Sequence, residues 1–184
     1  MDFFMQPFFT RDKFLNIEVP EGETKAFISI RTRDKKETAV VAAELHELVN
    51  ISTGLKIYRE EGRERFNRFV AWLNPKAPAD SLGFVHRNGN RTTNWGLSLL
   101  KQGEAPHRAY VCISWRENGK KGGLTFGIDP TMYILFERHV ANVVNTVEAN
   151  KTVLAREKRR EFFAGLAKNG QGTSKEKDQG YCPF

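Results

Sequence analysis

Cysteine is almost absent from this sequence. The 184 residues include only Cys112 and Cys182, too few for a disulfide framework or a cysteine-based zinc site. This scarcity is typical of a reducing compartment, so we expect a cytoplasmic protein. No apolar run approaches the roughly 18 residues of a membrane-spanning helix, and the first residues lack the basic start and long apolar segment of a signal peptide. We therefore expect no membrane partner.

The motifs of common enzyme classes are also missing. The sequence contains no GxSxG, Walker loop or GxGxxG. Its four histidines are scattered, and neither His46 nor His139 has the i, i+4 partner of a helical metal site. We therefore expect a protein that is not an enzyme and has no cofactor or metal. A metal-dependent nuclease stays open as an alternative, because its acidic ligands can be distant in sequence.

Positive charge is in excess and unevenly distributed. The formal net charge is +7 and the pI about 9.5, which favours polyanionic partners. Residues 11–73 hold 12 basic and 11 acidic residues, residues 82–128 hold 7 and 2, and residues 151–168 hold 6 and 2. The excess therefore lies in the second half of the chain.

The first half of the chain predicts a hairpin and two helices. Apolar residues alternate with polar ones over Lys13–Val19 and Lys25–Arg33, on either side of a turn, as in two paired strands. Apolar residues at near-helical spacing predict a helix over Lys36–Asn50 and another over Arg63–Leu73. Between them, Leu55–Tyr58 reads as a short strand.

The second half predicts a four-stranded meander and a long helix. Turn signals at Asn88-Gly89, Gly103–Pro106 and Asn118-Gly119 separate the four runs, which are Leu82–Arg87, Thr93–Lys101, Arg108–Arg116 and Gly122–Ile128. Asp129-Pro130 then matches the start of a helix, because Asp caps free N–H groups and Pro is tolerated at the first helical position.

These elements predict an α+β fold: a curved antiparallel sheet of six or seven strands, with helices on one face and a long C-terminal helix. We expect one domain over residues 1–168. The segment 169–184 is rich in Gly, Ser, Lys and Gln, and we expect a flexible tail.

Alternation sorts the strand residues by face and gathers cations and rings on the outer side. Phe27 and Tyr110 are its two aromatics, and the turns around Asn88-Gly89 and Asn118-Gly119 add further cations. The candidate binding residues are Lys25, Phe27, Arg31, Arg33, Arg87, Arg91, Arg108, Tyr110, Arg116, Lys120 and Lys121. The alternative for each residue is that it has no binding role and is simply a solvent-exposed position on a sheet with one buried face. Trp95 and Trp115 are assigned to the core.

This combination suits single-stranded nucleic acid. Aromatic rings stack unpaired bases without needing a particular sequence, and arginines neutralise phosphates. No candidate helix has the clustered basic and amide side chains that would read a major groove. We expect single-stranded DNA as the partner, with RNA left open.

The last residues, Asp178 to Phe184, end in Pro183-Phe184. A flexible tail that ends in Pro-Phe resembles the tip of bacterial single-stranded DNA-binding proteins, which presents these residues to replication and repair partners. The resemblance implies a protein partner at Pro183 and Phe184. The tail departs from the family pattern in being neutral, because Lys175 and Lys177 offset its acidic residues.

A curved sheet leading through Phe126–Pro130 into a long helix resembles the PC4 or Whirly type of single-strand binder. In those proteins the sheets bind the strand and the helices build the dimer. The resemblance implies a homo-oligomer through helix 130–148. An OB-fold barrel is the competing topology, because it uses a similar surface.

The hypothesis is therefore a single-stranded DNA-binding protein that acts in replication, recombination or repair. Small phage-encoded replication proteins fit this size and simplicity. The alternatives are a protein-binding transcription regulator, which would use the helix and tail without nucleic acid, and the nuclease.

Overall fold

Eight antiparallel strands form two separate four-stranded sheets in this computed structural model, which describes residues 8–100 and 108–170, with side chains to residue 165. The first sheet has the order β1-β2-β3-β4. Its strands are β1 (Phe8–Phe9), β2 (Lys13–Glu18), β3 (Ala26–Thr32) and β4 (Thr38–Ala43). The predicted hairpin is thus confirmed as β2 and β3, whose register pairs Leu15 with Ile30.

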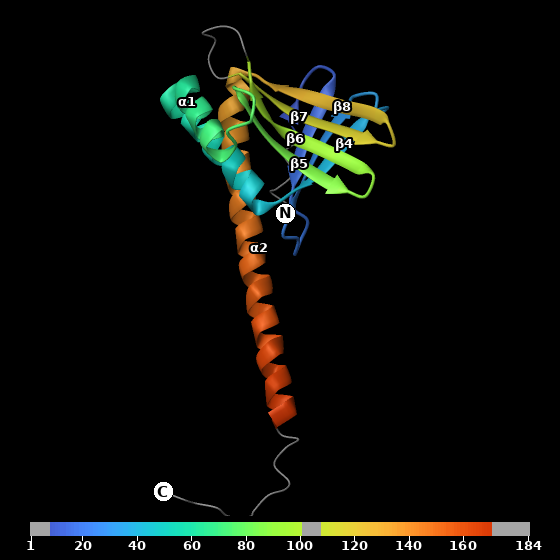
Figure 1. Cartoon of the computed structure of the whole chain (residues 1–184), viewed down its shortest axis with the longest axis vertical. Coiled ribbons are helices and arrows are strands. Elements are labelled where there is room, and N and C mark those ends of the chain that lie inside the picture. Colours follow the sequence, from blue (N-terminus) through green and yellow to red (C-terminus); the bar gives the residue numbers. More distant parts are fainter. Residues whose placement is uncertain (1–7, 101–107, 171–184) are drawn as a thin grey trace, which may run out of the picture.

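The second sheet is the predicted meander, with the order β5-β6-β7-β8. Its strands are β5 (Ser81–Asn88), β6 (Arg91–Leu99), β7 (Ala109–Glu117) and β8 (Lys120–Ile128). Two of its hairpins turn where the sequence predicts, after Asn88 and at Asn118-Gly119. The strands are long and curved, and these two turns stand at the free end of the sheet, away from the helices (Figure 1).

The inner faces of both sheets meet in one core. Ile17 and Ile28 of the first sheet and Leu97 and Val111 of the second are all at most 3% exposed. Burial of their aliphatic side chains removes apolar surface from water and drives the two sheets together. The fold class is α+β, as predicted, but the strands divide between two packed sheets and do not form one sheet or an OB barrel.

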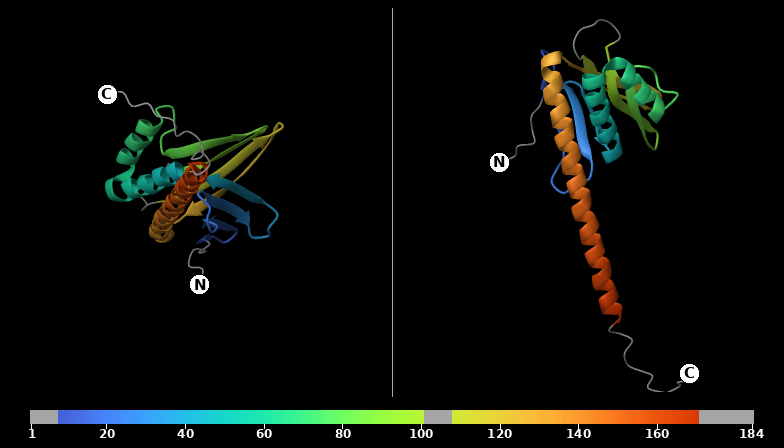
Figure 2. Two further views of the ribbon diagram at one scale, coloured as in Figure 1. Left: turned by 90° about the horizontal axis from the view of Figure 1, so that it is seen from below. Right: turned by 90° about the vertical axis from the view of Figure 1, so that its left-hand side faces the viewer.

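Two helices lie beside each other on the same side of the sheets (Figure 1, Figure 2). They are α1 (Leu45–Leu73) and α2 (Pro130–Gly170). Gly62 has a φ of 83° and a ψ of −176°, so the first helix breaks there into two parts that run in different directions. Asp129 caps α2 as predicted, because its carboxylate accepts a 2.8 Å hydrogen bond from the Met132 N–H.

Two predictions for the first half of the chain are wrong. The predicted helix Lys36–Asn50 is a strand over Thr38–Ala43, and the helix begins only at Leu45. The strand buries Ala39, Val41 and Ala43 on one face with a period of two. The predicted strand Leu55–Tyr58 is helical, because Leu55 and Tyr58 are buried on the core side of α1.

The apolar face of α2 belongs to the core of the same chain. Tyr133, Phe136, Val140, Val143 and Val147 are each at most 2% exposed. The Tyr133 hydroxyl donates a 2.8 Å hydrogen bond to the Leu55 carbonyl, which joins the two helices. The face expected to pair helix 130–148 with a second copy is thus buried within one chain, so these side chains are not available for such pairing.

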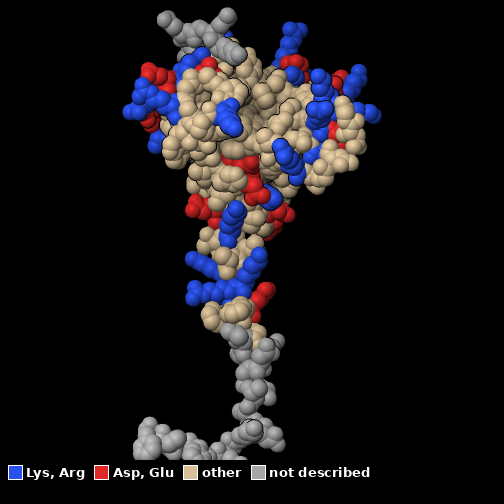
Figure 3. Space-filling model, viewed as in Figure 1, with Lys and Arg blue, Asp and Glu red and all other residues tan. Residues whose placement is uncertain are grey.

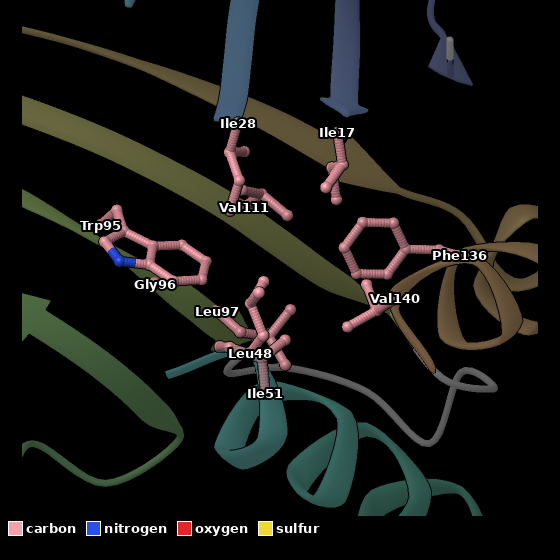
Figure 4. A pocket seen from close by; sticks show the side chains of 10 residues that line it. All are labelled: Ile17, Ile28, Leu48, Ile51, Trp95, Gly96, Leu97, Val111, Phe136 and Val140. Carbon is pink, nitrogen blue, oxygen red and sulfur yellow. The ribbon is translucent and has the colours of Figure 1, made fainter. Parts of the chain in front are cut away.

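A small apolar gap remains where both sheets and both helices meet. Figure 4 shows side chains from every layer around it, including Ile28, Trp95, Val111 and Phe136. Its volume is about 10 Å³, which leaves room for one water molecule at most. The gap is a packing imperfection and is too small for a ligand. No helix within the described ranges has an apolar stretch long enough to cross a membrane.

Gly96 marks a close approach between β5 and β6, where it lies opposite Gly83. A Cβ on Gly96 would collide with the Leu82 carbonyl oxygen and lie 2.8 Å from the Gly83 Cα, whereas a Cβ on Gly83 would lie 3.8 Å from its nearest neighbour. We expect Gly96→Ala to lower the free energy of unfolding by about 3 kcal/mol, because backbone atoms must shift. Gly83→Ala should change it by less than about 1 kcal/mol. Urea unfolding of both variants checks this, and equal effects would contradict it.

Candidate nucleic-acid interface

The outer face of the second sheet is a broad surface with few large side chains. Its register aligns four rows across β5, β6, β7 and β8. The rows are Ser81-Ser98-Tyr110-Gly127, Gly83-Gly96-Cys112-Thr125, Val85-Asn94-Ser114-Gly123 and Arg87-Thr92-Arg116-Lys121. Small residues occupy the two middle rows almost entirely, so an extended ligand can lie close to the backbone there.

The last row places cations at the hairpin turns. The ends of the two hairpins carry five cations, here called the tip cluster: Arg87, Arg91, Arg116, Lys120 and Lys121. All five are exposed, and no ion pair within residues 8–100 and 108–165 includes any of them. Glu117 lies opposite both Arg91 and Lys120 in the register, but one carboxylate against five cations leaves this end of the sheet with an excess of positive charge. Figure 3 shows basic side chains gathered at this end of the sheet.

Trp115 supports the tip cluster from the inner face. Its ring lies against Gly122, where any Cβ would collide with it. The Arg91 guanidinium carbon lies 5.8 Å from the ring centroid, within the range of a cation–π contact. The expectation that both tryptophans lie in the core is confirmed for Trp95 and wrong for Trp115, which is half-buried near the end of the sheet and outside the core. Its ring orients one cation of the tip cluster.

Tyr110 stands at the opposite end of the same outer face. It is 38% exposed, and its ring lies over Gly127, which has no side chain to displace it. Arg108 is exposed just before β7, and Arg116 ends the same line of outward side chains. The predicted alternation of β7 is therefore confirmed, with a ring at one end of the face and cations at the other.

The predicted binding residues nevertheless divide between two surfaces. Phe27 lies on the outer face of the first sheet, where its register neighbours are Glu18 and Ala42. Both outer faces point away from a shared core, so Phe27 and Tyr110 cannot stack bases on one common platform. The division arises because the period of two gives the parity of each strand but not the sheet to which it belongs.

The cations on the first sheet are less available than those of the tip cluster. The Lys25 ammonium lies 2.7 Å from a Glu44 carboxylate oxygen, and this hydrogen bond raises the pKa of Lys25 and lowers that of Glu44. Arg33 donates to the Arg11 carbonyl at 3.3 Å. Arg31 and Arg33 are both exposed and form no ion pair in the described part of the chain, so the first sheet has two unpaired cations against the five of the tip cluster. The second sheet is thus the better candidate interface.

A cleft opens beside the tip cluster, between the edge strand β4 and the inner side of β5 and β6. Thr38, Val40, Val41 and Ala42 line one wall, and His86, Asn88, Arg91 and Thr93 line the other. Its volume is about 470 Å³, enough for a nucleotide-sized group. Asn88 and Arg91 line the cleft and also lie at the hairpin end, so the cleft continues directly into the tip cluster.

A buried carboxylate next to this cleft, Glu47, is not among the residues predicted from the sequence, and it holds the cleft residue His86 in place. Glu47 is 4% exposed, and one of its oxygens lies 2.7 Å from His86 Nε2. The other oxygen accepts hydrogen bonds from the Glu44 backbone N–H at 2.8 Å and from Trp95 Nε1 at 3.4 Å. The first turn of α1 is thereby attached to β5 and β6. The Glu44-x-x-Glu47 spacing of a capping box is a sequence signal that could have pointed to Glu47, which a helix over Lys36–Asn50 would instead place on its outer side.

The remaining residues considered in the sequence are a histidine of α2 and the Pro-Phe tip. His139 Nε2 donates a 3.0 Å hydrogen bond to the Ile17 carbonyl of the first sheet, and the ring packs edge-on against Phe8. Within the described ranges, no three His, Cys, Asp or Glu side chains lie close enough together to hold a metal ion. Pro183 and Phe184, the predicted protein-binding tip, lie outside the described residues.

Comparisons with known proteins identify the fold. No family model matches the sequence, and no curated protein matches it. Three solved structures share the fold: WHY3 and WHY1 from Arabidopsis thaliana and the plant transcriptional regulator PBF-2. The TM-scores are 0.54, 0.54 and 0.53, and the identities 11%, 9% and 9%. The matches cover 86%, 97% and 83% of this chain, and 96%, 96% and 86% of the others. The expected Whirly-like topology is therefore confirmed.

We expect Glu47→Ala to lower the free energy of unfolding by about 3 kcal/mol, because three donors lose their acceptor in a buried position. Glu61 of the same helix is the matched control: it is exposed and pairs with Arg65 at 3.2 Å on the surface. Glu61→Ala should cost less than about 0.5 kcal/mol. Urea unfolding followed by tryptophan fluorescence measures both, and a small effect at Glu47 would rule out its role in joining α1 to the sheet.

Proposed function

We propose that this chain is a single-stranded DNA-binding protein that acts in replication, recombination or repair and holds the strand on its second sheet. The observation that carries the proposal is the tip cluster, five exposed cations without an ion pair in the described part of the chain, at the end of a face with small side chains. The shared fold supports it, because the Whirly type binds single strands through its sheets.

The chemistry of this surface suits a single strand better than a duplex. The cations are spread over two neighbouring hairpin ends and do not form the single helix face or narrow two-stranded ribbon that enters a groove. Tyr110 offers an exposed ring for an unpaired base, and the cleft beside Arg91 is large enough for another. Phosphates bound at the tip cluster would also relieve the repulsion among its five charges. RNA would satisfy the same contacts.

A transcription regulator that binds proteins is the second candidate. Trp72 favours it: this side chain is 77% exposed and stacks on Phe69 with the ring centroids 6.3 Å apart. A large exposed ring outside the second sheet is typical of a protein-binding surface. PBF-2, which shares the fold, is itself a transcriptional regulator.

A gel shift at physiological salt distinguishes these functions. The probes are single-stranded DNA, duplex DNA and RNA of one sequence, each with and without magnesium. We expect a shift with single-stranded DNA and a weaker one with the duplex. No shift with any probe would favour the protein-binding regulator, and magnesium-dependent loss of the probe would indicate a nuclease.

The tip cluster should dominate the salt dependence of binding. The triple variant Arg87→Gln, Arg116→Gln, Lys121→Gln removes the cationic row of the outer face. We expect the slope of log K against log salt to become less steep by about 2, at about 0.7 for each lost single-strand phosphate contact. The control, Arg31→Gln with Arg33→Gln, changes the first sheet and should leave the slope unchanged. The reverse pattern in a fluorescence titration would move the interface to the first sheet.

Tyr110 should contribute by stacking. We expect Tyr110→Ala to weaken binding of a thymidine oligonucleotide by about 1–3 kcal/mol, and Tyr110→Phe to retain it, because the ring face is preserved. Phe27→Ala, on the other outer face, serves as the control and should leave the affinity unchanged. Fluorescence anisotropy gives the three dissociation constants. Equal losses for Phe27→Ala and Tyr110→Ala would contradict the choice of the second sheet.

A further inference from the structure

The second half of α2 leaves the body of the protein and projects into solvent (Figure 1, Figure 2). Val147 is its last fully buried side chain, and Asn150 makes its last hydrogen bond to the body, donating to the Glu23 carbonyl at 2.8 Å. Every residue from 152 to 165 is exposed, over about 20 Å of helix. These residues are called the projecting segment below.

The projecting segment is basic, and its charge is not neutralised by the protein. It carries four cations, Arg156, Lys158, Arg159 and Arg160, against Glu157 and Glu161. None of the ion pairs found within residues 8–100 and 108–165 includes these cations. Figure 3 shows the basic side chains around this part of the helix. Arg156 and Arg160 are one turn apart, a spacing at which like charges destabilise a helix.

Three of the four cations share one side of the helix. At about 100° per residue, Arg156, Arg159 and Arg160 lie within an arc of about 100°, and Lys158 points to nearly the opposite side. The apolar residues do not form a separate face, since Val153 and Leu154 are neighbours, as are Phe162 and Phe163. A helix that lies on a membrane needs separate apolar and basic faces, and a coiled coil needs one apolar seam. The segment has neither.

Aromatic rings accompany the charge. Phe162 and Phe163 are 64% and 54% exposed, and the Arg159 guanidinium carbon lies 5.7 Å from the Phe163 ring centroid. Exposed rings beside arginines are the groups that stack unpaired bases while neutralising their phosphates. The bases of a duplex are already stacked on one another, so the exposed rings favour a single strand.

We propose that the projecting segment is a second contact for single-stranded DNA, which lengthens the stretch of strand that one copy of the chain holds. This inference rests on the proposed binding of single-stranded DNA by the second sheet. The phosphates would replace the repulsion between Arg156 and Arg160 with attraction, so the strand would also stabilise the exposed helix.

The test compares thymidine oligonucleotides of about 10 and about 40 nucleotides, since one small binding domain covers about 4–16. The full-length variant Arg156→Gln, Lys158→Gln, Arg159→Gln, Arg160→Gln removes the charge and keeps residues of good helix propensity. We expect it to bind the long strand about tenfold or more weakly, with a salt slope less steep by about 3. The short strand, held at the tip cluster, should bind as before.

The control variant is Glu157→Gln with Glu161→Gln, which removes the carboxylates of the same segment and should strengthen binding of the long strand. Circular dichroism confirms that both variants retain the helix. An unchanged affinity and slope for the long strand would overturn this inference alone, as would an equal loss for both lengths or for a long duplex. If the unaltered protein binds neither the short nor the long oligonucleotide, both the proposed function and this inference are wrong.

Discussion

Burial of two sheet faces and one helix face in a single core is the constraint on which the rest of the molecule depends. The aliphatic sides of β2, β3, β6 and β7 cannot remain in water, and Phe136 and Val140 of α2 complete their burial. This arrangement turns both outer faces to solvent and leaves the hairpin ends of the second sheet extending beyond the core. The candidate interface is therefore a consequence of how the core closes.

Electrostatics then separates the cations into two groups. Six of those near the body form ion pairs, among them Arg59 with Glu137 at 2.7 Å, Lys25 with Glu44 at 2.7 Å, and Arg65 with Glu61 at 3.2 Å. In the described part of the chain, the cations on the hairpin ends and on the projecting part of α2 form none. These two protruding places, where cations have no ion pair in the described part of the chain, are where we propose that a polyanion binds.

Local rules predicted much of this structure because the relevant signals are short-ranged. The meander follows from strict alternation and from turn residues such as Asn118-Gly119, and the start of α2 follows from Asp129. The strand Thr38–Ala43 was mistaken for a helix because a short run of Ala and Val fits either period. The helical segment Leu55–Tyr58 was mistaken for a strand because its helical state depends on packing against Tyr133, a residue far away in sequence.

The same division holds for the site. Parity along β7 is a property of the chain alone, so the outward placement of Arg108, Tyr110 and Arg116 could be deduced from the sequence. Only the tertiary structure assigned Phe27 and Tyr110 to different sheets, joined Glu47 to His86 and Trp95, and buried the apolar face of α2. Alternation and capping act within one element, whereas sheet membership and burial depend on contacts between residues tens of positions apart.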